Sequence, residues 1–146
     1  MSLLLLDHAP LHLDVLEEAR HQSRLQHYSA AVVTAQTAAE IRAAAALTEL
    51  FQLRGVPELE APVRHVLHNT NLGHEDVRRF YEALSGDVIS TTFPRWSDFR
   101  MHARLRNSIV HEGARATRQE AEASISIVAA LSGHVDAVLD ARRTTF

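Results

Sequence analysis

Apolar side chains recur along the chain at the three- and four-residue intervals of an α-helix. Between residues 28 and 53 the pattern holds without a break, and this segment contains neither Gly nor Pro. Its apolar stripe consists of Val32, Ala35, Ala39, Ala43, Ala46 and Leu50. Such spacing places all six side chains on one face of a helix. The pattern therefore predicts a long helix over Tyr28–Leu53, which Gly55 and Pro57 bring to an end.

A second stripe predicts another long helix near the end of the chain, over about residues 118–142. Its members are Ala121, Ile125, Val128, Leu131, Val135 and Val138. Thr117 and Glu120 have the spacing of a capping box, in which the hydroxyl and the carboxylate satisfy backbone N–H groups at a helix start. We expect this helix to begin directly after Thr117.

The rest of the pattern predicts shorter helices. We expect them over about Leu11–His27, Ala61–His68, His74–Leu84 and residues 94–112. Pro94 suits the first turn of the last of these, and Gly113 suits its end. The segment Asp87–Phe93 is rich in β-branched residues and predicts an extended connector that is too short to supply a sheet. The sequence thus predicts one all-α domain over residues 1–146, an up-and-down bundle of about five to six helices.

Composition narrows the chemistry that this bundle can perform. The 146 residues include no Cys, which excludes disulfide frameworks, Cys-based zinc sites and thiol catalysis. The formal net charge of −3 argues against a protein that coats nucleic acid with its whole surface, so any RNA contact must be local. The Leu-rich segment Met1–Leu6 is followed at once by Asp7 and Pro10, and is too short for a signal peptide or a membrane span. We expect a cytoplasmic protein that has no membrane partner.

Residues with reactive or charged side chains gather on the predicted helix over residues 94–112. On a helical wheel, Arg106 falls within the apolar face and Asn107 falls at its rim. The polar edge beyond this rim carries Arg100, Arg104 and His111. A guanidinium that is removed from water needs an anionic or carbonyl partner, or a bound phosphate. We expect Glu40, on the long helix over residues 28–53, to be the structural partner of Arg106.

The segment Arg106–Gly113 resembles the signature of the HEPN superfamily of helical bundles. That signature is an Arg, then four to six residues, then a His, often with Asn directly after the Arg; here Asn107 follows Arg106 and four residues precede His111. The setting is similar too, because the motif lies late on a helix and a short turn leads to a long closing helix. The spacing alone also fits Arg20 with His27 and Arg104 with His111, which lack the Asn.

The resemblance extends beyond this motif, over about residues 28–139. The sequence Ala38–Arg42 is similar to the long upstream helix of the family. The resemblance implies a metal-independent endoribonuclease without a cofactor, acting as a homodimer in which two copies of the motif meet in a cleft. It also implies a role in bacterial defence or in a toxin–antitoxin pair, with an antitoxin or a nucleotidyltransferase as partner.

The resemblance implies a role for each motif residue. Arg106, Asn107 and His111 would be catalytic. The ribose 2′-hydroxyl would attack the neighbouring phosphorus, while the imidazole transfers a proton near neutral pH and the guanidinium holds the phosphate. Arg100 and Arg104 are expected to bind the RNA substrate. DNA, which lacks the 2′-hydroxyl, should not be cut.

Two other interpretations of the chain stay open. It could be a non-catalytic protein of the same fold that binds a partner or a nucleotide, or a structural helical protein in which the motif is coincidental. His65, His68 and His74 lie close together in sequence, but no His-Glu-x-x-His pair is present, and we expect no metal site. The aromatic residues Phe93, Trp96 and Phe99 could stack on bases, but aromatic residues at helical spacing are more often in the core, and we expect them there.

Overall fold

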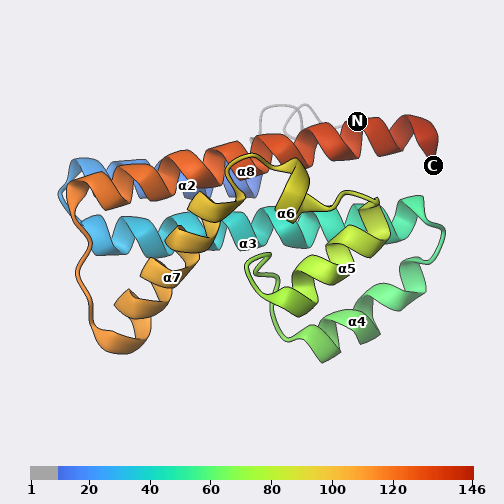
Figure 1. The fold of residues 1–146 in the computed structure, drawn as a ribbon, viewed down its shortest axis with the longest axis horizontal. Helices are drawn as coiled ribbons and strands as arrows, with labels where there is room; N and C mark the ends of the chain where they lie inside the picture. Colours follow the sequence, from blue (N-terminus) through green and yellow to red (C-terminus); the bar gives the residue numbers. More distant parts are fainter. Residues whose placement is uncertain (1–9) are drawn as a thin grey trace, which may run out of the picture.

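The computed structural model describes residues 10–146, and this part of the chain is helical without any strand (Figure 1). The predicted all-α class is confirmed. The described residues form seven α-helices and one 3₁₀-helix, more than the five to six helices expected. The segment Met1–Leu6, for which we predicted neither a signal peptide nor a membrane span, lies outside the described residues.

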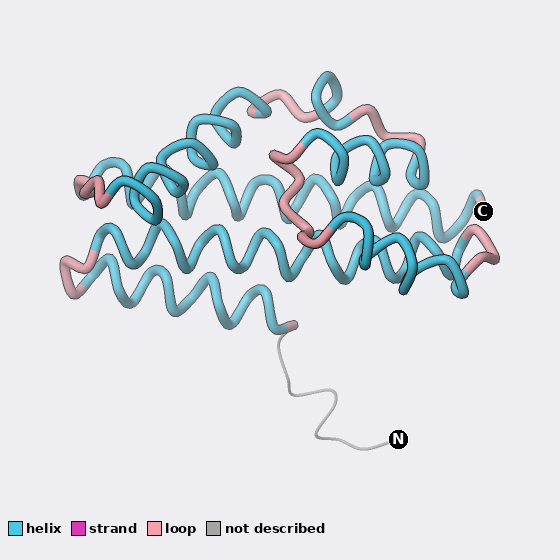
Figure 2. The backbone as a smooth tube through the Cα atoms, turned by 90° about the horizontal axis from the view of Figure 1, so that it is seen from below, coloured by secondary structure: helices cyan, strands magenta, loops and turns pink. Residues whose placement is uncertain are grey.

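Three helices lie side by side, two of them along the length of the molecule and the shorter α2 along part of it (Figures 1 and 2). They are α2 (Leu11–Arg24), α3 (Tyr28–Leu53) and α8 (Arg118–Thr145). Helix α3 has the predicted bounds, and it contributes many small side chains to the core. Its buried alanines are Ala31, Ala35, Ala38, Ala39, Ala43 and Ala46. Small side chains let neighbouring helices approach closely, so α3 serves as the axis on which the other helices pack.

Helices α3 and α8 run in the same direction. The Nε atom of Arg42 lies 2.9 Å from Asp136, and seven residues further along both helices Arg143 binds Glu49 at 2.6 Å. In the predicted order of six helices these are the second and the sixth, which an alternating order also makes parallel. The chain returns from the end of α3 to its beginning through α4 to α7, before α8 starts.

A smaller group of helices covers one side of α3. After the 3₁₀-helix Pro57–Leu59, α4 (Glu60–Leu67) and α5 (Glu75–Ser85) form a hairpin, followed by the single turn α6 (Ile89–Thr92). Arg64 on α4 donates a hydrogen bond to the carbonyl of Ala44 on α3 at 2.7 Å. The expected extended connector is wrong at α6, because a turn this short needs no apolar periodicity to form.

Helix α7 (Trp96–Glu112) crosses the long helices obliquely and leads into the loop before α8 (Figure 1). It begins two residues after Pro94, which therefore lies outside its first turn. Gly113 ends α7 with φ of 71°, as expected. The capping box at the start of α8 is confirmed, because the N–H of Glu120 donates to the Thr117 hydroxyl at 3.2 Å and the Glu120 carboxylate accepts from the N–H of Thr117 at 2.9 Å.

Helix α8 is the one described helix that is long and apolar enough to cross a membrane. Its most apolar stretch is 44% buried inside the protein, and a core helix passes the same test of length and composition. The buried face includes the predicted members Ala121, Ile125, Val128, Leu131 and Val135. Of the predicted stripe, Val138 is only partly buried.

Candidate functional site

The three motif residues lie on the last two turns of α7, at the end that faces the loop to α8. Arg106 is half-buried, whereas Asn107 and His111 are exposed. One guanidinium nitrogen of Arg106, Nη1, donates to the Asn107 Oδ1 atom at 3.2 Å. Asn107 thus holds the guanidinium beside the exposed edge of the helix through its amide oxygen. Its two amide N–H donors are not engaged within residues 10–146 and can bind another group.

The expected ion pair between Arg106 and Glu40 is not formed. Helices α3 and α7 run in opposite directions, since His102 contacts Gln36 while the loop after α7 returns to Ser29 at the start of α3. Arg106 lies one turn beyond His102 towards that start, whereas Glu40 lies one turn beyond Gln36 in the other direction. The register between the two helices thus separates the two charges.

The positive charge of Arg106 is left without a carboxylate among residues 10–146. Its Nε atom is buried and has no hydrogen-bond partner there. Arg100, Arg104 and Arg115 form neither an ion pair nor a side-chain hydrogen bond within this part of the chain. From Arg95 to Arg115 the sequence holds five Arg and only two acidic residues, a formal charge of +3 in a chain whose total is −3. The helix therefore forms a local basic surface.

The structure brings Arg106 and His111 to the same end of α7 but not to the same face. Five residues of α-helix separate two side chains by about 7.5 Å along the axis and about 140° around it. One phosphate could not contact both groups of a single helix in good geometry. Two copies of the helix, related by a twofold axis, could surround one phosphate from both sides.

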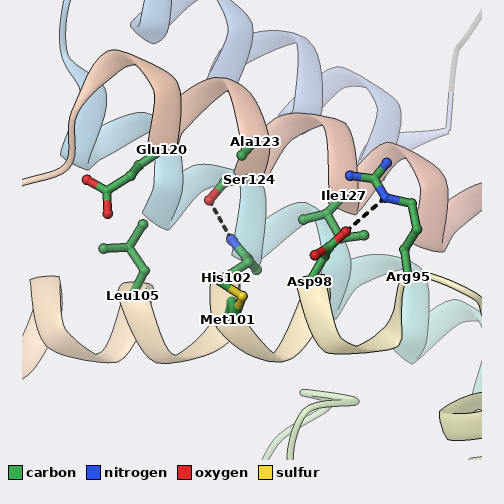
Figure 3. Close-up of a pocket in the computed structure, with 9 residues that line it drawn as sticks. All are labelled: Arg95, Asp98, Met101, His102, Leu105, Glu120, Ala123, Ser124 and Ile127. Carbon is green, nitrogen blue, oxygen red and sulfur yellow. Dashed lines mark hydrogen bonds and ion pairs between the residues drawn. The ribbon is translucent and has the colours of Figure 1, made fainter.

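His102 is a buried histidine of α7 that sequence reasoning missed. Its Nδ1 lies 2.7 Å from the Ser124 hydroxyl of α8, and its Nε2 lies 2.9 Å from the Gln36 amide oxygen of α3 (Figure 3 shows the first contact). Burial lowers the pKa of His102 to about 4, and the charge of Arg106 also lowers it. The ring is therefore neutral at pH 7. It links α3, α7 and α8 through its two nitrogens and does not serve as a general acid. On the helical wheel His102 falls on the apolar side, and this position could have identified it as a buried residue.

A groove of about 270 Å³ lies between α7 and α8, beside this histidine (Figure 3). Met101 and Leu105 line it from α7, and Ile127 lines it from α8. Met101 is 64% exposed, so the groove presents an apolar side chain to solvent. Arg95 and Asp98 form an ion pair at one end of the groove.

A second polar cluster, also not predicted, lies where α5, α6 and α8 meet. Buried Asp87 accepts hydrogen bonds from the Tyr81 hydroxyl at 2.8 Å and from Thr92, and its Oδ2 lies 2.8 Å from His134 Nε2. Burial alone would raise the pKa of Asp87, but the hydrogen bonds from Thr92, His134 and Tyr81 outweigh it and hold the pKa below its usual range. The polar side chains of this cluster bind one another, and the cluster thereby connects α5, α6 and α8.

The remaining candidates from the sequence lie apart from the motif. Within residues 10–146, no three His, Asp or Glu side chains lie close enough together to hold a metal ion. The rings of His65 and His68 are 6.0 Å apart. Phe93 and Phe99 are buried as expected, while Trp96 packs on the core and remains partly exposed.

Comparison with known proteins identifies no relative. The chain matches no family model, no curated protein and no solved structure. The assignment of a function therefore depends on the residues of α7 and on their surroundings.

Proposed function

We propose that the protein is a metal-independent endoribonuclease of the HEPN type that acts as a homodimer. The observation that carries this proposal is the end of α7, where a half-buried guanidinium that has no carboxylate partner within residues 10–146 lies beside the exposed Asn107 and His111. Arg100 and Arg104 on the same helix, which form no ion pair with the described part of the chain, supply a basic path for the RNA backbone. Their local charge fits a protein that is acidic overall and must bind RNA at one place.

In the proposed reaction, one RNA strand lies between the motifs of two subunits. A neutral His111 accepts the proton of a ribose 2′-hydroxyl, and the 2′-oxygen forms a bond to the adjacent phosphorus. The bond from phosphorus to the 5′-oxygen breaks, and a protonated His111 of the partner subunit supplies the proton to that oxygen. Arg106 offsets the negative charge on the phosphorane, and Asn107 holds the guanidinium in place. The products are a 2′,3′-cyclic phosphate and a 5′-hydroxyl.

The test of this proposal is cleavage of single-stranded RNA by the purified protein in the presence of EDTA. We expect cyclic phosphate ends by mass spectrometry and no cleavage of DNA of the same sequence. His111→Ala should reduce the rate by about 10²–10⁴-fold, because the proton transfers lose their catalyst. His65→Ala is the matched control, because His65 is an exposed histidine on a different helix. Absence of cleavage by the wild-type homodimer on a panel of unstructured RNAs, or equal rates for both variants, would contradict the nuclease.

A second function is favoured by one observation, the apolar groove beside Met101. A non-catalytic domain of the same fold would use this groove to bind a partner protein, such as an antitoxin or a nucleotidyltransferase. It predicts no cleavage by either the wild type or His111→Ala. It also predicts a stable complex that Met101→Asp disrupts when the proteins encoded by neighbouring genes are produced together. The two functions therefore differ in the result of the same cleavage assay.

A further inference from the structure

A polar pocket of about 300 Å³ lies at the other end of α7, where this helix meets the start of α5. It is lined by Gly73, Glu75, Arg78, Trp96 and Arg100. The pocket contains none of the three motif residues. Arg100 lies eleven residues before His111, which corresponds to about 16 Å along the axis of α7. The pocket is thus a separate site on the same helix.

The charges that line this pocket are mainly positive and mostly free. Neither Arg78 nor Arg100 forms an ion pair or a side-chain hydrogen bond with any of residues 10–146. The one carboxylate of the pocket, Glu75, lies 3.8 Å from Arg79, a weak contact between two side chains that are each 70% exposed. Two guanidinium groups against one carboxylate leave the pocket with an excess positive charge, which suits a phosphodiester.

Trp96 adds an aromatic surface to these cations. Its ring packs on buried Phe99 with the ring centroids 5.6 Å apart, so the indole is held in place by the core, and part of it lines the pocket. A fixed aromatic ring beside unpaired arginines is the combination that binds single-stranded nucleic acid, because the ring stacks on a base while the cations hold the backbone. The combination does not depend on which base is present.

We propose that this pocket binds one nucleotide of single-stranded RNA, a few nucleotides from the bond that is cut. The base stacks on Trp96, and a phosphate of the same strand lies between Arg78 and Arg100. This inference extends the proposed function, because it identifies where the strand leaves the motif. It also extends the expected role of Arg100, which binds the strand together with Arg78 on α5 and is not an isolated contact on α7.

The pocket carries its own reporter, because Trp96 is the single tryptophan of the chain. The experiment titrates the full-length His111→Ala protein, which should not cut its ligand, with a short single-stranded RNA while the fluorescence of Trp96 is recorded. We expect quenching that saturates. Double-stranded RNA of the same length should quench little, because its paired bases cannot stack on the indole. Single-stranded DNA should quench comparably, because the proposed contacts do not use the 2′-hydroxyl.

Variants of the charged residues test the geometry. In the His111→Ala background, Arg78→Gln and Arg100→Gln should each weaken RNA binding several-fold. Each should also reduce the slope of log affinity against log salt by about 0.7, the value for one lost phosphate contact on a single strand. Glu75→Gln should strengthen binding, because it removes the one repulsive charge. Arg20→Gln, on α2 and away from the pocket, is the control and should leave both affinity and slope unchanged.

The results separate this inference from the proposed function. If the wild type cuts RNA but RNA leaves the fluorescence of Trp96 unchanged in His111→Ala, the strand takes another path and the pocket assignment is wrong, while the nuclease stands. If RNA quenches Trp96 with the expected response to Arg78→Gln but the wild type cuts no RNA, the pocket assignment stands and the nuclease is wrong. Equal affinities for Arg78→Gln, Arg100→Gln and Arg20→Gln would also overturn the pocket assignment.

Discussion

His102 is a residue whose protonation in the folded protein differs from that in an unfolded chain at mildly acidic pH. Its ring is 4% exposed, and both of its nitrogens contact buried polar groups. Burial lowers the pKa of His102 to about 4, while an unfolded chain binds this proton with a pKa of about 6.5. Between these two values the unfolded state binds more protons than the folded state. Stability due to His102 must therefore fall as the pH falls.

We predict that lowering the pH from 7.5 to 5 removes about 2 kcal/mol of folding free energy through His102. The measurement compares urea unfolding of the wild type and His102→Gln at both pH values. The wild type should lose more stability than the variant, although the variant starts from a lower value because Ser124 and Gln36 lose a partner. His65→Gln is the control and should behave as the wild type. An NMR signal of the His102 ring that titrates near pH 6.5 in the folded protein would contradict the prediction.

Among single residues, Arg106 shows what can and what cannot be predicted from the sequence. The helical wheel placed its side chain in the apolar face, and the structure buries its Nε atom. The position of Arg106 on its own helix follows from a fixed rotation per residue. The predicted pairing of Arg106 with Glu40 was wrong, because the register between two helices depends on how their side chains pack. His102 was missed for a similar reason, since its two partners come from two other helices.

Helix α6 shows how a short element can depend on one buried side chain. It is a single turn between α5 and α7, and Asp87 just before it accepts hydrogen bonds from Tyr81 and Thr92 and contacts His134 on α8. Hydrogen bonds to a buried carboxylate contribute more than those between neutral groups. The carboxylate thus holds the turn against α8, and with it the start of α7.

We predict that Asp87→Ala destabilises the protein by about 3 kcal/mol, because it leaves buried donors without an acceptor. Hydrogen exchange should become faster at the amides of residues 88–93 than at those of α3. The stabilising effect of Asp87 should be present above about pH 4 and be lost at lower pH, since its pKa in the folded protein is lowered. Asp140→Ala, at an exposed Asp of α8, is the control and should change stability little. Unchanged exchange in residues 88–93 would show that the turn does not depend on Asp87.

At the level of elements, every helix of two or more turns within residues 10–146 was predicted, including α4 and α5, whose bounds differ from the predicted ones by one residue at each end. The 3₁₀-helix and the single turn α6 were not predicted. Tyr28–Leu53 was predicted with the bounds that the structure has, because its apolar stripe spans about five turns and Gly55 follows. The start of α8 was predicted because a capping box is a local pattern of four residues. The turn Ile89–Thr92 has β-branched residues that favour extended backbone, and its side-chain hydrogen bonds, including that of Thr92 to buried Asp87, overrode that preference.

For the whole molecule, the proposed activity depends on a second copy, because one α7 cannot place Arg106 and His111 on the same side. Val110 is 47% exposed and lies on α7 between these two residues. A homodimer that brings two motifs together would bury this side chain. The proposed dimer therefore makes a prediction about a residue that takes no part in the chemistry.

We predict that Val110→Asp weakens the homodimer at least tenfold and reduces RNA cleavage in proportion, because a carboxylate would be buried without a partner at the interface. Analytical ultracentrifugation over a range of concentrations measures the first effect. The control is Val66→Asp on α4, whose side chain is 71% exposed and which should leave the dimer intact. A wild-type protein that stays monomeric at every concentration, or a Val110→Asp dimer as stable as that of the wild type, would contradict the composite site.

The row of buried alanines along α3 has a consequence for how the protein can change. Where cohesion comes from backbones lying close together, any larger side chain must push two helices apart, and overpacking of this kind costs about 1–3 kcal/mol per site. A library randomised at Ala35, Ala39, Ala43 and Ala46 and selected for folded protein should return almost only Ala, Gly and Ser. The exposed side of α7 is under no such restriction. Substitutions there can change what the protein binds, while the sequence of α3 stays nearly fixed.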